Sequence, residues 1–420
     1  MKKFLALLLA TLMLLSLVAC GGEETKDDSS ADASVVDGSE DASATEGSED
    51  VAASDFKVGA IYINSQNDTA GYTFAHHNGI TKAMEQLGIS KDNLFIVDNV
   101  PEDDTQVSNA IDTLAGKGCN IIFGISFGYL NAMNEAAAKD EYKDIIFSHA
   151  TGYLANETNF NNYFGRIYQA RYLSGIAAGL KSLELGNNNL GYVAAWGTEY
   201  AETCSGINAF ALGAQSVNPD AQVYVNKIST WGDEAKERQA AEALIDTYNC
   251  GVITQHCDSA QPQLVAAEKN LFGCGYNSDM SVQAPTAHLT APIWNWDVYY
   301  KLAIETARDD AANFMTKVGI YYGGLKENFV DISALSDNCA ANTKEIVAAV
   351  KELIISGEWD VFSGVKLSYT VADGKVEITK TDAPLVDNAG NEIVAAGGAS
   401  VDDGVIKGSM NYYVAGVIEG

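Results

Sequence analysis

Aromatic and polar side chains gather in seven short segments, each directly after a stretch that we predict to be a β-strand. Trp, Tyr and Phe are frequent in these segments, together with a few carboxylates and amides. Aromatic faces combined with a few fixed polar groups suit the binding of a flat, polar small molecule. The segments are 64–74, 124–129, 196–200, 229–233, 256–260, 277–280 and 293–297.

From these segments we select the side chains best suited to contact such a ligand. Some have a plainer alternative role. Trp231 would also suit packing between two domains, and Asp68 a tight turn. Asp258 would suit the cap of a helix beginning at Ala260, and Asp279 the cap of a helix or turn. The candidate ligand-binding residues are Asp68, Tyr72, Phe74, Phe127, Trp196, Trp231, Asp258, Asp279 and Trp296.

The histidines and serines form no complete catalytic pattern. His256 and Asp258 would suit a metal or acid–base site, but no third ligand is evident. Ser126 stands between Gly124 and Gly128, but no histidine or acid partner is evident for it. Neither a phosphate-binding loop nor a dinucleotide-binding glycine pattern follows the first predicted strand. We therefore predict a binding protein with no catalytic residues, metal or cofactor.

Short apolar stretches alternate with amphipathic ones through the first part of the chain. Val107, Ala110, Ile111 and Leu114 are spaced so that they form one stripe of a helix. Strands that alternate with helices predict a parallel, doubly wound sheet. The predicted strands are 57–63, 93–97, 120–124 and 144–147, and the predicted helices are 74–87, 105–117 and 129–139.

The same order restarts after a long helix predicted over 170–183, with strands over 190–195, 222–226, 251–254 and 272–276. Helices over 203–218, 233–248 and 260–270 separate them. We therefore predict an α/β fold of two doubly wound lobes joined by a hinge, with ligand beyond the carboxyl ends of the strands. The predicted lobes are 56–167 with about 290–330, and 168–289 with about 331–420; we expect 354–420 to complete the second sheet and the hinge crossings.

The N-terminal 55 residues predict export and a membrane anchor. Lys2 and Lys3 precede an apolar run that is too short to span a membrane, and a small residue precedes Cys20. This site resembles a bacterial lipoprotein lipobox, which implies a signal peptide over 1–20 and a lipid on Cys20. An ordinary signal peptide with an incidental cysteine is the alternative. Residues 21–55 carry twelve acidic residues and one lysine, so we predict a disordered, extended tether on the extracytoplasmic face of the cell membrane.

Charge and cysteine spacing argue against two other classes of protein. The formal net charge of −30 would repel nucleic acid, so we expect no nucleic-acid partner. The cysteines beyond Cys20 form no C-x-x-C motif and have no paired histidines nearby, so they do not indicate a zinc site. Disulfides are compatible with export, but the sequence leaves open any pairing among Cys119, Cys204, Cys250, Cys257, Cys274 and Cys339.

Several spaced motifs resemble the basic membrane protein family of substrate-binding lipoproteins, over about 57–420. They include Tyr163-Phe164-Gly165-Arg166, Gln169-Ala170-Arg171-Tyr172, Gly191-Tyr192-Val193-Ala194-Ala195, Gly206-Ile207-Asn208-Ala209-Phe210, Gln255-His256-Cys257-Asp258-Ser259, Gly275-Tyr276-Asn277-Ser278-Asp279-Met280 and Trp294-Asn295-Trp296. The resemblance implies a type I periplasmic-binding fold, and a monomer that delivers a purine nucleoside or purine base to an ABC permease and its ATPase. The alternatives are a sugar or signalling molecule in the same fold, a sensory lipoprotein, and an exported nucleoside-cleaving enzyme.

The resemblance also implies roles for single residues. The loop 68–76 is similar to the family pattern Asp-x-Gly-Trp-Thr-x-x-His, with Tyr72 in place of Trp and one extra residue after the acid. Trp231 resembles the aromatic residue that stacks on the base, and Asp279 the acid that binds ribose hydroxyls. Trp296 stands where other members have a lysine near the sugar, which favours a free base over a nucleoside.

Overall fold

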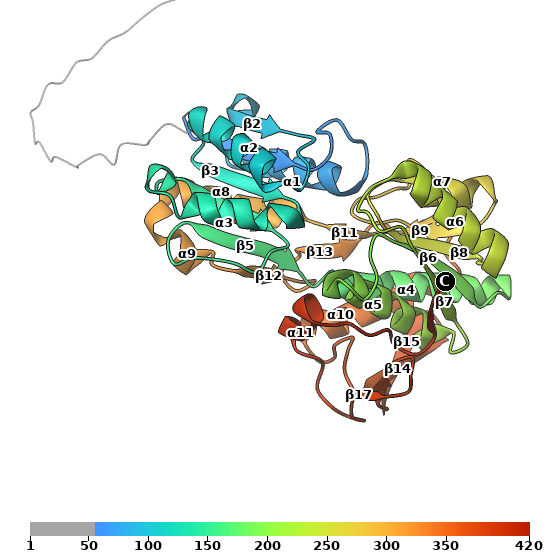
Figure 1. The fold of residues 1–420 in the computed structure, drawn as a ribbon. Helices are drawn as coiled ribbons and strands as arrows, with labels where there is room; N and C mark the ends of the chain where they lie inside the picture. Colours follow the sequence, from blue (N-terminus) through green and yellow to red (C-terminus); the bar gives the residue numbers. More distant parts are fainter. Residues whose placement is uncertain (1–54) are drawn as a thin grey trace, which may run out of the picture. The chain divides into compact units, whose positions relative to one another are not determined.

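The computed structural model describes residues 55–420. The predicted signal peptide, the lipid site at Cys20 and the predicted tether up to residue 54 lie outside the described residues. The described part contains two α/β lobes, each built on a six-stranded parallel sheet (Figure 1). The predicted fold class is therefore confirmed, whereas the predicted lobe boundaries remain predictions.

The first lobe surrounds a sheet with the strand order β12-β5-β4-β3-β1-β2. Every residue of β1 and β3 is buried, as expected for central parallel strands covered by helices on both faces. The strands are β1 (Val58–Tyr62), β2 (Leu94–Val97), β3 (Ile121–Ile125), β4 (Ile146–Ala150), β5 (Phe160–Gly165) and β12 (Tyr321–Gly323). The helices are α1 (Gly71–Gln86), α2 (Asp104–Gly116), α3 (Leu130–Ala137), α8 (Trp296–Asp309) and α9 (Phe314–Lys317).

The second lobe surrounds a sheet with the strand order β10-β9-β8-β6-β7-β18. Its strands are β6 (Asn189–Ala194), β7 (Gln222–Lys227), β8 (Val252–His256), β9 (Phe272–Cys274), β10 (His288–Thr290) and β18 (Val417–Glu419). Its helices are α4 (Ile167–Leu185), α5 (Ala201–Val217), α6 (Glu234–Tyr248), α7 (Gln261–Glu268), α10 (Thr343–Ser356) and α11 (Asp403–Gly408). In both sheets the central strands lead into loops at the same edge, where the candidate residues lie.

Local signals explain where helices begin and end. The side chain of Asp103 accepts a hydrogen bond from the backbone N–H of Gln106 (3.1 Å) and so caps α2. Asp233 caps α6 in the same way, through the N–H of Lys236. Helix α4 ends at Leu185, and the capping residue Gly186 adopts the left-handed conformation (φ 61°) typical of the position after a helix. These caps hold the helix starts next to the strand ends.

Helices α4 and α5 pack closely because glycines remove side chains from their contact. A Cβ added at Gly175 would lie 2.2 Å from the carbonyl oxygen of Phe210, and one at Gly213 would lie 2.1 Å from that of Tyr172. Only glycine allows the two backbones to approach this far. The pair forms a rigid support for the N-terminus of α5, which reaches the site described below.

The chain passes between the two lobes at 165–167, 290–296 and 323–330. Strands β11 (Pro292–Trp294) and β13 (Val330–Ile332) pair antiparallel within two of these crossings. They tie two crossings together outside the main sheets, as a hinge between the lobes requires.

Several features differ from the sequence prediction, among them β5 and the C-terminal segment. Strand β5 was not predicted because Asn161 and Asn162 interrupt its apolar pattern; both amides are buried and donate to backbone carbonyls, of Gly319 (2.6 Å) and Leu154 (3.0 Å) respectively. The expectation for 354–420 was also wrong in part. Only β18 joins the second sheet, whereas β14 (Val365–Ala372) with β15 (Lys375–Asp382), and β16 (Leu385–Val386) with β17 (Glu392–Val394), form separate two-stranded sheets.

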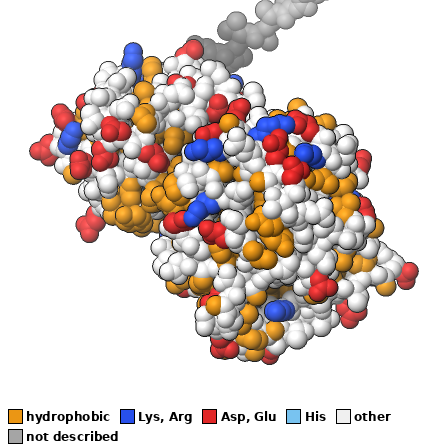
Figure 2. All heavy atoms as spheres, turned by 45° about the vertical axis from the view of Figure 1, so that its right-hand side comes forward, with side chains coloured by type: hydrophobic (Ala, Val, Ile, Leu, Met, Phe, Trp, Pro, Cys, Tyr) orange, Lys and Arg blue, Asp and Glu red, His pale blue; other side chains and the backbone are white. Residues whose placement is uncertain are grey.

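Charged side chains on the face drawn in Figure 2 are scattered, and most basic groups lie next to acidic ones. This mixing agrees with ion pairs such as Arg238–Glu268 and Lys351–Asp331. Within residues 55–420, no helix has the length and apolar character needed to cross a membrane.

Candidate functional site

A cavity of about 540 Å³ lies between the two lobes. It is walled by loops that follow β1, β3 and β4 of the first lobe and β6, β7, β8 and β9 of the second, at the carboxyl ends of the strands as predicted. Helix α11 completes the wall. The lining residues are Ile63, Tyr72, Ser126, Phe127, Thr151, Gly152, Tyr153, Phe164, Glu199, Tyr200, Ala201, Glu202, Trp231, His256, Asp258, Tyr276, Asn277, Gly404, Lys407 and Gly408.

The loop after β1 bridges the two lobes along one side of the cavity. The amide of Asn64 donates to Asp258 Oδ2 over 3.3 Å. The amide of Gln283 donates to the carbonyl oxygen of Thr69 over 3.1 Å. Because both contacts join residues of different lobes, the described conformation is a closed one.

Gly71 makes the closest contact of this loop with the second lobe. Its N–H donates to Ser278 Oγ over 3.3 Å. A Cβ at this position would lie 1.7 Å from the carbonyl oxygen of Asp258, and the backbone has φ +83°. Both the space and the backbone conformation require glycine here for the lobes to close.

Aromatic rings from both lobes form much of the cavity wall. Trp231 meets the ring of Tyr200 edge-on at 5.4 Å between centroids, and Trp196 packs against both. Phe127 of the first lobe meets Tyr200 of the second at 5.8 Å, also edge-on. Trp231 and Phe127 line the cavity as predicted, whereas Trp196 supports the wall from behind. These ring faces suit a planar ligand.

Tyr72 brings a polar atom to the same wall. Its hydroxyl is buried and has no hydrogen-bond partner in the structure. Burial raises the pKa of Tyr72 well above its usual value, so the hydroxyl keeps its proton and is free to donate. Its ring packs edge-on against His76 and Trp296, which fixes its direction.

Asn277 is a cavity residue that lies in one of the seven predicted segments but was not among the selected candidates. Its side chain is only 2% exposed, yet neither the amide oxygen nor the amide nitrogen has a partner. The residue follows β9 in a left-handed conformation (φ 65°). A buried amide with both atoms free presents a donor and an acceptor side by side, the pattern that pairs with one edge of a nucleobase. Its place directly after a predicted strand was the available signal.

Asp258 contributes a carboxylate whose pKa is raised well above its usual value. Burial is the main cause and Glu237 the second, while the hydrogen bond from Asn64 acts in the opposite direction. The alternative role as a helix cap is wrong, because the cap of α7 is Ala260 and the N–H of Gln261 bonds to Ser259 Oγ instead. Asp258 therefore does not cap α7; it lines the cavity, and its Oδ2 accepts from Asn64.

Glu202 and His256 form a polar pair on the cavity wall, 3.2 Å apart. Burial raises the pKa of Glu202 to about 7, against the opposing effects of Arg171 and of a hydrogen bond from Tyr276. Burial and the nearby Arg171 lower the pKa of His256 well below its usual value. Arg171 itself is fully buried, stacked 3.6 Å from the ring centre of Tyr276 and bonded to the carbonyl oxygen of Gln255. At neutral pH His256 is therefore uncharged, and the carboxyl group of Glu202 is near the midpoint of its titration.

Four predicted residues do not line the cavity, besides Trp196. Asp68 lies in a turn, where its backbone N–H donates to the carbonyl oxygen of Ser65. Phe74 is half-buried on α1. Trp296 is buried at the start of α8, where it stacks on His76 at 3.8 Å between ring centres. The part of these residues in ligand binding remains a prediction.

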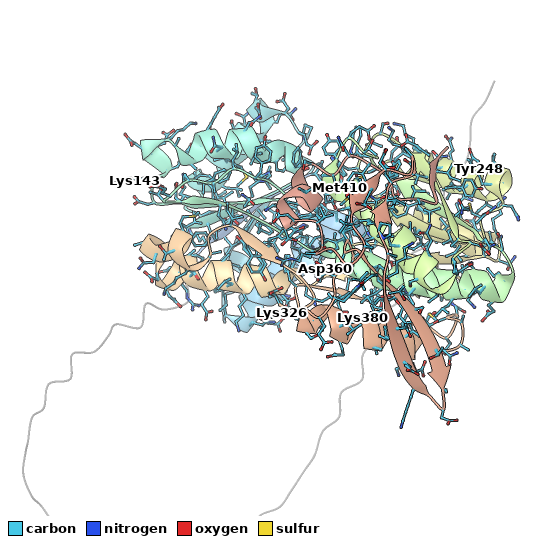
Figure 3. The ribbon with its side chains drawn as sticks, turned by 90° about the horizontal axis from the view of Figure 1, so that it is seen from below. Lys143, Tyr248, Lys326, Asp360, Lys380 and Met410 are labelled. Atoms are coloured by element: carbon cyan, nitrogen blue, oxygen red, sulfur yellow. The ribbon has the colours of Figure 1, made fainter. Side chains whose placement is uncertain are left out.

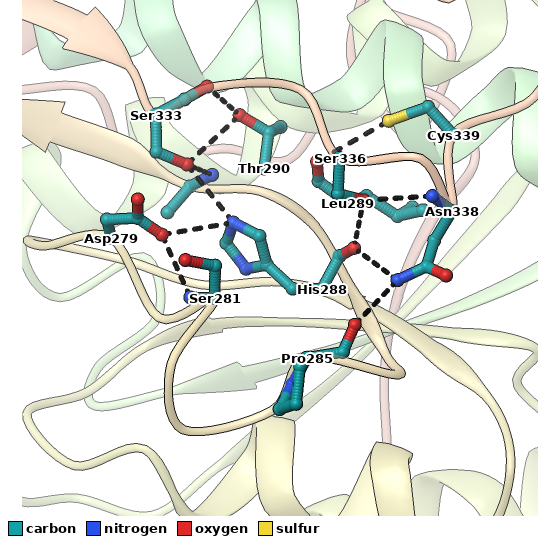
Figure 4. A network of polar contacts seen from close by, with 11 residues as sticks. Asp279, Ser281, Pro285, His288, Leu289, Thr290, Ser333, Ser336, Asn338 and Cys339 are labelled. Atoms are coloured by element: carbon teal, nitrogen blue, oxygen red, sulfur yellow. Dashed lines mark hydrogen bonds and ion pairs between the residues drawn. The ribbon is translucent and has the colours of Figure 1, made fainter.

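Asp279 is the fourth of these residues and belongs to a separate polar network, shown in Figure 4. Its Oδ1 accepts from the N–H of Ser281 (2.8 Å) and lies 3.4 Å from His288 Nε2. His288 Nε2 also contacts Ser333 Oγ at 3.2 Å, beside a hinge crossing. In this conformation Asp279 therefore caps a turn, which is the alternative role that the sequence analysis gave it.

Ser126 lines the cavity, but its contacts are not those of a nucleophile. The run 124–128 has the glycine and serine spacing of a nucleophile elbow. Its hydroxyl, however, donates to Glu102 Oε1 (2.6 Å), and His149 contacts the carbonyl oxygen of Ser126 instead of Oγ. A Cβ on Gly124 would lie 2.0 Å from Met133 Sδ, so packing explains this glycine.

No metal site and no disulfide is present in the described part of the chain. Within residues 55–420, no group of three His, Cys, Asp or Glu side chains converges as metal binding requires. The six cysteines of this part are all unpaired.

Comparison with known proteins identifies relatives over most of the chain. The model of a family described as PnrA-like ABC transporter substrate-binding proteins (Bmp) matches residues 56–363. A purine-binding protein of Brucella abortus (strain 2308) is 34% identical over 361 residues, covering 86% of this chain and 92% of that protein. A putative ABC transporter glucose-binding protein of Haloferax volcanii is 34% identical over 304 residues, covering 72% and 73%.

Solved structures share the fold. A solute-binding protein of an ABC transporter system from Aeropyrum pernix K1 superimposes with a TM-score of 0.60 at 16% identity, covering 76% of this chain and 94% of that one. One from Conexibacter woesei gives 0.55 at 19% identity, covering 73% and 98%. The type I periplasmic-binding fold that the motifs implied is therefore confirmed.

Proposed function

Because the chain belongs to the Bmp family of PnrA-like ABC transporter substrate-binding proteins, we propose that it captures a purine nucleoside or purine base for an ABC importer. The observation that carries this proposal is the buried amide of Asn277, a residue of the aromatic cavity whose donor and acceptor both lack a partner. A relative named as purine-binding supports the same ligand class.

In the proposed binding mode, aromatic rings contact the faces of the ligand and polar groups form hydrogen bonds with its edges. Trp231, Phe127 and Tyr72 contact the faces of the heterocycle. Asn277 pairs with one of its edges, and the Tyr72 hydroxyl and the Asp258 carboxyl bind the remaining polar atoms. The loop bearing Gly71 then closes over the ligand and changes the surface that the permease meets.

Mass spectrometry of small molecules released from the purified protein tests the ligand class. We expect a purine base or nucleoside after denaturation. A sugar as the sole released compound would support the second candidate, a sugar-binding protein, which the relative named as glucose-binding favours.

We further propose that the protein acts as a monomer on the extracytoplasmic face, held by a lipid on Cys20 and partnered by an ABC permease and ATPase. Cells grown with a clickable palmitate analogue should label the protein. The Cys20→Ala variant should lose the label and leave the membrane fraction, and a labelled variant would refute the anchor.

The protein is also proposed to return its ligand unchanged. The contacts of Ser126 support this, because its hydroxyl bonds to Glu102 instead of a histidine. Incubation of the purified protein with inosine or guanosine should release no free base. Release of hypoxanthine or guanine would overturn the proposal.

A further inference from the structure

Three buried polar atoms behind the cavity wall lack hydrogen-bond partners. They are Nε of Arg171, the hydroxyl oxygen of Tyr192 and Nδ1 of His256, and none of them bonds to any atom within residues 55–420. Arg171 and Tyr192 are fully buried, and His256 is 5% exposed. Native folds rarely leave such atoms unpaired, so this group of atoms requires an explanation.

The three atoms surround the position where Gly206 of α5 lacks a side chain. A Cβ added at Gly206 would lie 3.4 Å from Arg171 Nε, 3.5 Å from the Tyr192 hydroxyl oxygen and 3.7 Å from His256 Nδ1. A Cβ on Gly213 of the same helix would instead lie 2.1 Å from a backbone oxygen, so packing requires that glycine but not Gly206. The absence of a side chain at Gly206 leaves space between polar atoms.

Four elements of the second lobe enclose this space, and each contributes a residue from a different motif that resembles the family. These residues are Arg171 on α4, Tyr192 on β6, Gly206 on α5 and His256 at the end of β8. The C-terminal segment also covers α5, where Asn208 Nδ2 lies 3.4 Å from the sulfur of Met410, labelled in Figure 3. Bulk solvent therefore does not reach the three polar atoms.

A single water molecule matches the donors and acceptors around this space. A water oxygen cannot approach the helix backbone as closely as a bonded Cβ does, so it lies farther out and nearer to the polar atoms. The arginine Nε–H can only donate, the tyrosine hydroxyl can donate or accept, and a neutral histidine accepts at one of its ring nitrogens. Three polar partners in an enclosed space meet the requirements of a buried water.

Such a water determines which ring nitrogen of His256 carries the proton. Burial and the nearby Arg171 lower the pKa of His256 well below its usual value, so the ring is neutral and carries one proton. His256 Nε2 lies 3.2 Å from Glu202 Oε1, and an ionised carboxylate can only accept. The proton therefore lies on Nε2, and Nδ1 accepts a hydrogen bond from the water.

We propose that the space at Gly206 binds one water molecule, which is held by Arg171, Tyr192 and His256. Through this water His256 becomes a fixed donor to Glu202, and Glu202 presents a hydrogen-bond acceptor to the ligand cavity that it lines. Arg171, Tyr192 and Gly206 do not line that cavity, so they are positioning residues that act through His256 and Glu202. The proposal is independent of the ligand that the cavity takes.

The Gly206→Ala variant tests the water site through the sign of a stability change. Its methyl group enters without a clash, in van der Waals contact with all three polar atoms, and leaves no room for a water. The Tm of the full-length, ligand-free chain in mild detergent should fall by about 2 °C or more, although alanine is the better helix former. Gly116→Ala, at the exposed end of α2 where a Cβ meets no atom within 4 Å, is the matched control and should raise the Tm slightly. A Gly206→Ala variant at least as stable as the wild-type protein would overturn the water site.

Tyr192→Phe provides a second variant, because it removes only a hydroxyl group. It should also lower the Tm, since the water loses a partner, whereas removal of a hydroxyl that has no partner would raise the Tm and overturn the proposal.

NMR of the ¹⁵N-histidine-labelled protein at pH 8, where Glu202 is ionised, measures the position of the proton directly. The His256 signals are assigned by their loss in the His256→Gln variant. The wild-type protein should carry the proton on Nε2, and in Gly206→Ala the Nδ1 resonance should move toward that of a nitrogen without a hydrogen bond. A wild-type proton on Nδ1, or an Nδ1 resonance that Gly206→Ala leaves unchanged, would refute the proposal. Because no ligand is present, these results are independent of the proposed function.

Discussion

Glu202 gives the most specific prediction, because burial and ionisation oppose each other at this side chain. Its carboxyl group lies on the cavity wall beside His256, and burial raises its pKa from 4.5 to about 7. In the unfolded chain the carboxyl loses its proton near the ordinary value, whereas the folded protein retains it until about pH 7. Stability must therefore fall as pH rises from about 4.5 to about 7. The Glu202→Gln variant, neutral at every pH, should not show this loss.

The size of the effect follows from the two pKa values. The interval from 4.5 to about 7 corresponds to about 3 kcal/mol, at about 1.36 kcal/mol for each pH unit. The side chain is 21% exposed, so water screens part of this penalty, and we expect about 1–3 kcal/mol. At pH 8 the variant should thus be more stable than the wild-type protein, and at pH 5 the two should differ little.

Thermal unfolding of the ligand-free protein, followed by calorimetry at pH 5 and pH 8, measures this difference. We expect Glu202→Gln to raise the Tm by a few degrees at pH 8 only. Glu199→Gln is the matched control, because Glu199 lines the same cavity but its pKa is lowered, first by a hydrogen bond from Lys227. This control should not gain stability at pH 8. A Glu202→Gln variant equally destabilised at both pH values would refute the reasoning, since it would mean that Arg171 stabilises the carboxylate more than burial penalises it.

Three further variants test the cavity itself by calorimetric titration with purines. Gly71→Ala places a Cβ 1.7 Å from the carbonyl oxygen of Asp258 and should weaken binding at least about tenfold by opposing closure; an unchanged affinity would contradict the closed lobe contact. Asn277→Ala removes a buried donor and acceptor and should weaken binding about tenfold to a hundredfold. A loss confined to Tm, with affinity retained, would make this amide structural. Trp231→Ala should cost about tenfold through lost stacking, and unaltered binding would place the ring outside the ligand contact.

Most of the fold could be predicted from the sequence because its central strands are continuous apolar runs between amphipathic helices. β1 and β3, buried at every position, are examples. The C-terminal hairpin of β14 and β15 was not predicted, although apolar and polar residues alternate from Val365 to Val371 and the turn is Asp373-Gly374. Strand β5 escaped because buried amides replaced apolar residues, and one of their backbone partners, Gly319, lies far along the chain.

The candidate site was predictable to the extent that it depends on strand ends. Tyr72, Phe127, Trp231 and Asp258 all follow predicted strands and all line the cavity. Trp296 does not line the cavity, because it begins α8 and its ring stacks on Trp294 in the core.

Two contributions to the site depended on tertiary structure. The free amide of Asn277 is recognisable only from the absence of partners around it. Lys407 lies far along the chain from the other lining residues, and only the packing of α11 on α5 brings it to the cavity. The place of Asn277 after a predicted strand marks its position, but sequence spacing reveals neither its unpartnered amide nor the approach of Lys407 to the cavity.

Calorimetric titration of the wild-type protein with adenine, guanine, adenosine, inosine and glucose is the most direct test of purine capture by the closed aromatic cavity. The account predicts saturable, one-to-one binding of at least one purine compound and no heat with glucose. Binding of glucose with no response to any purine would contradict it.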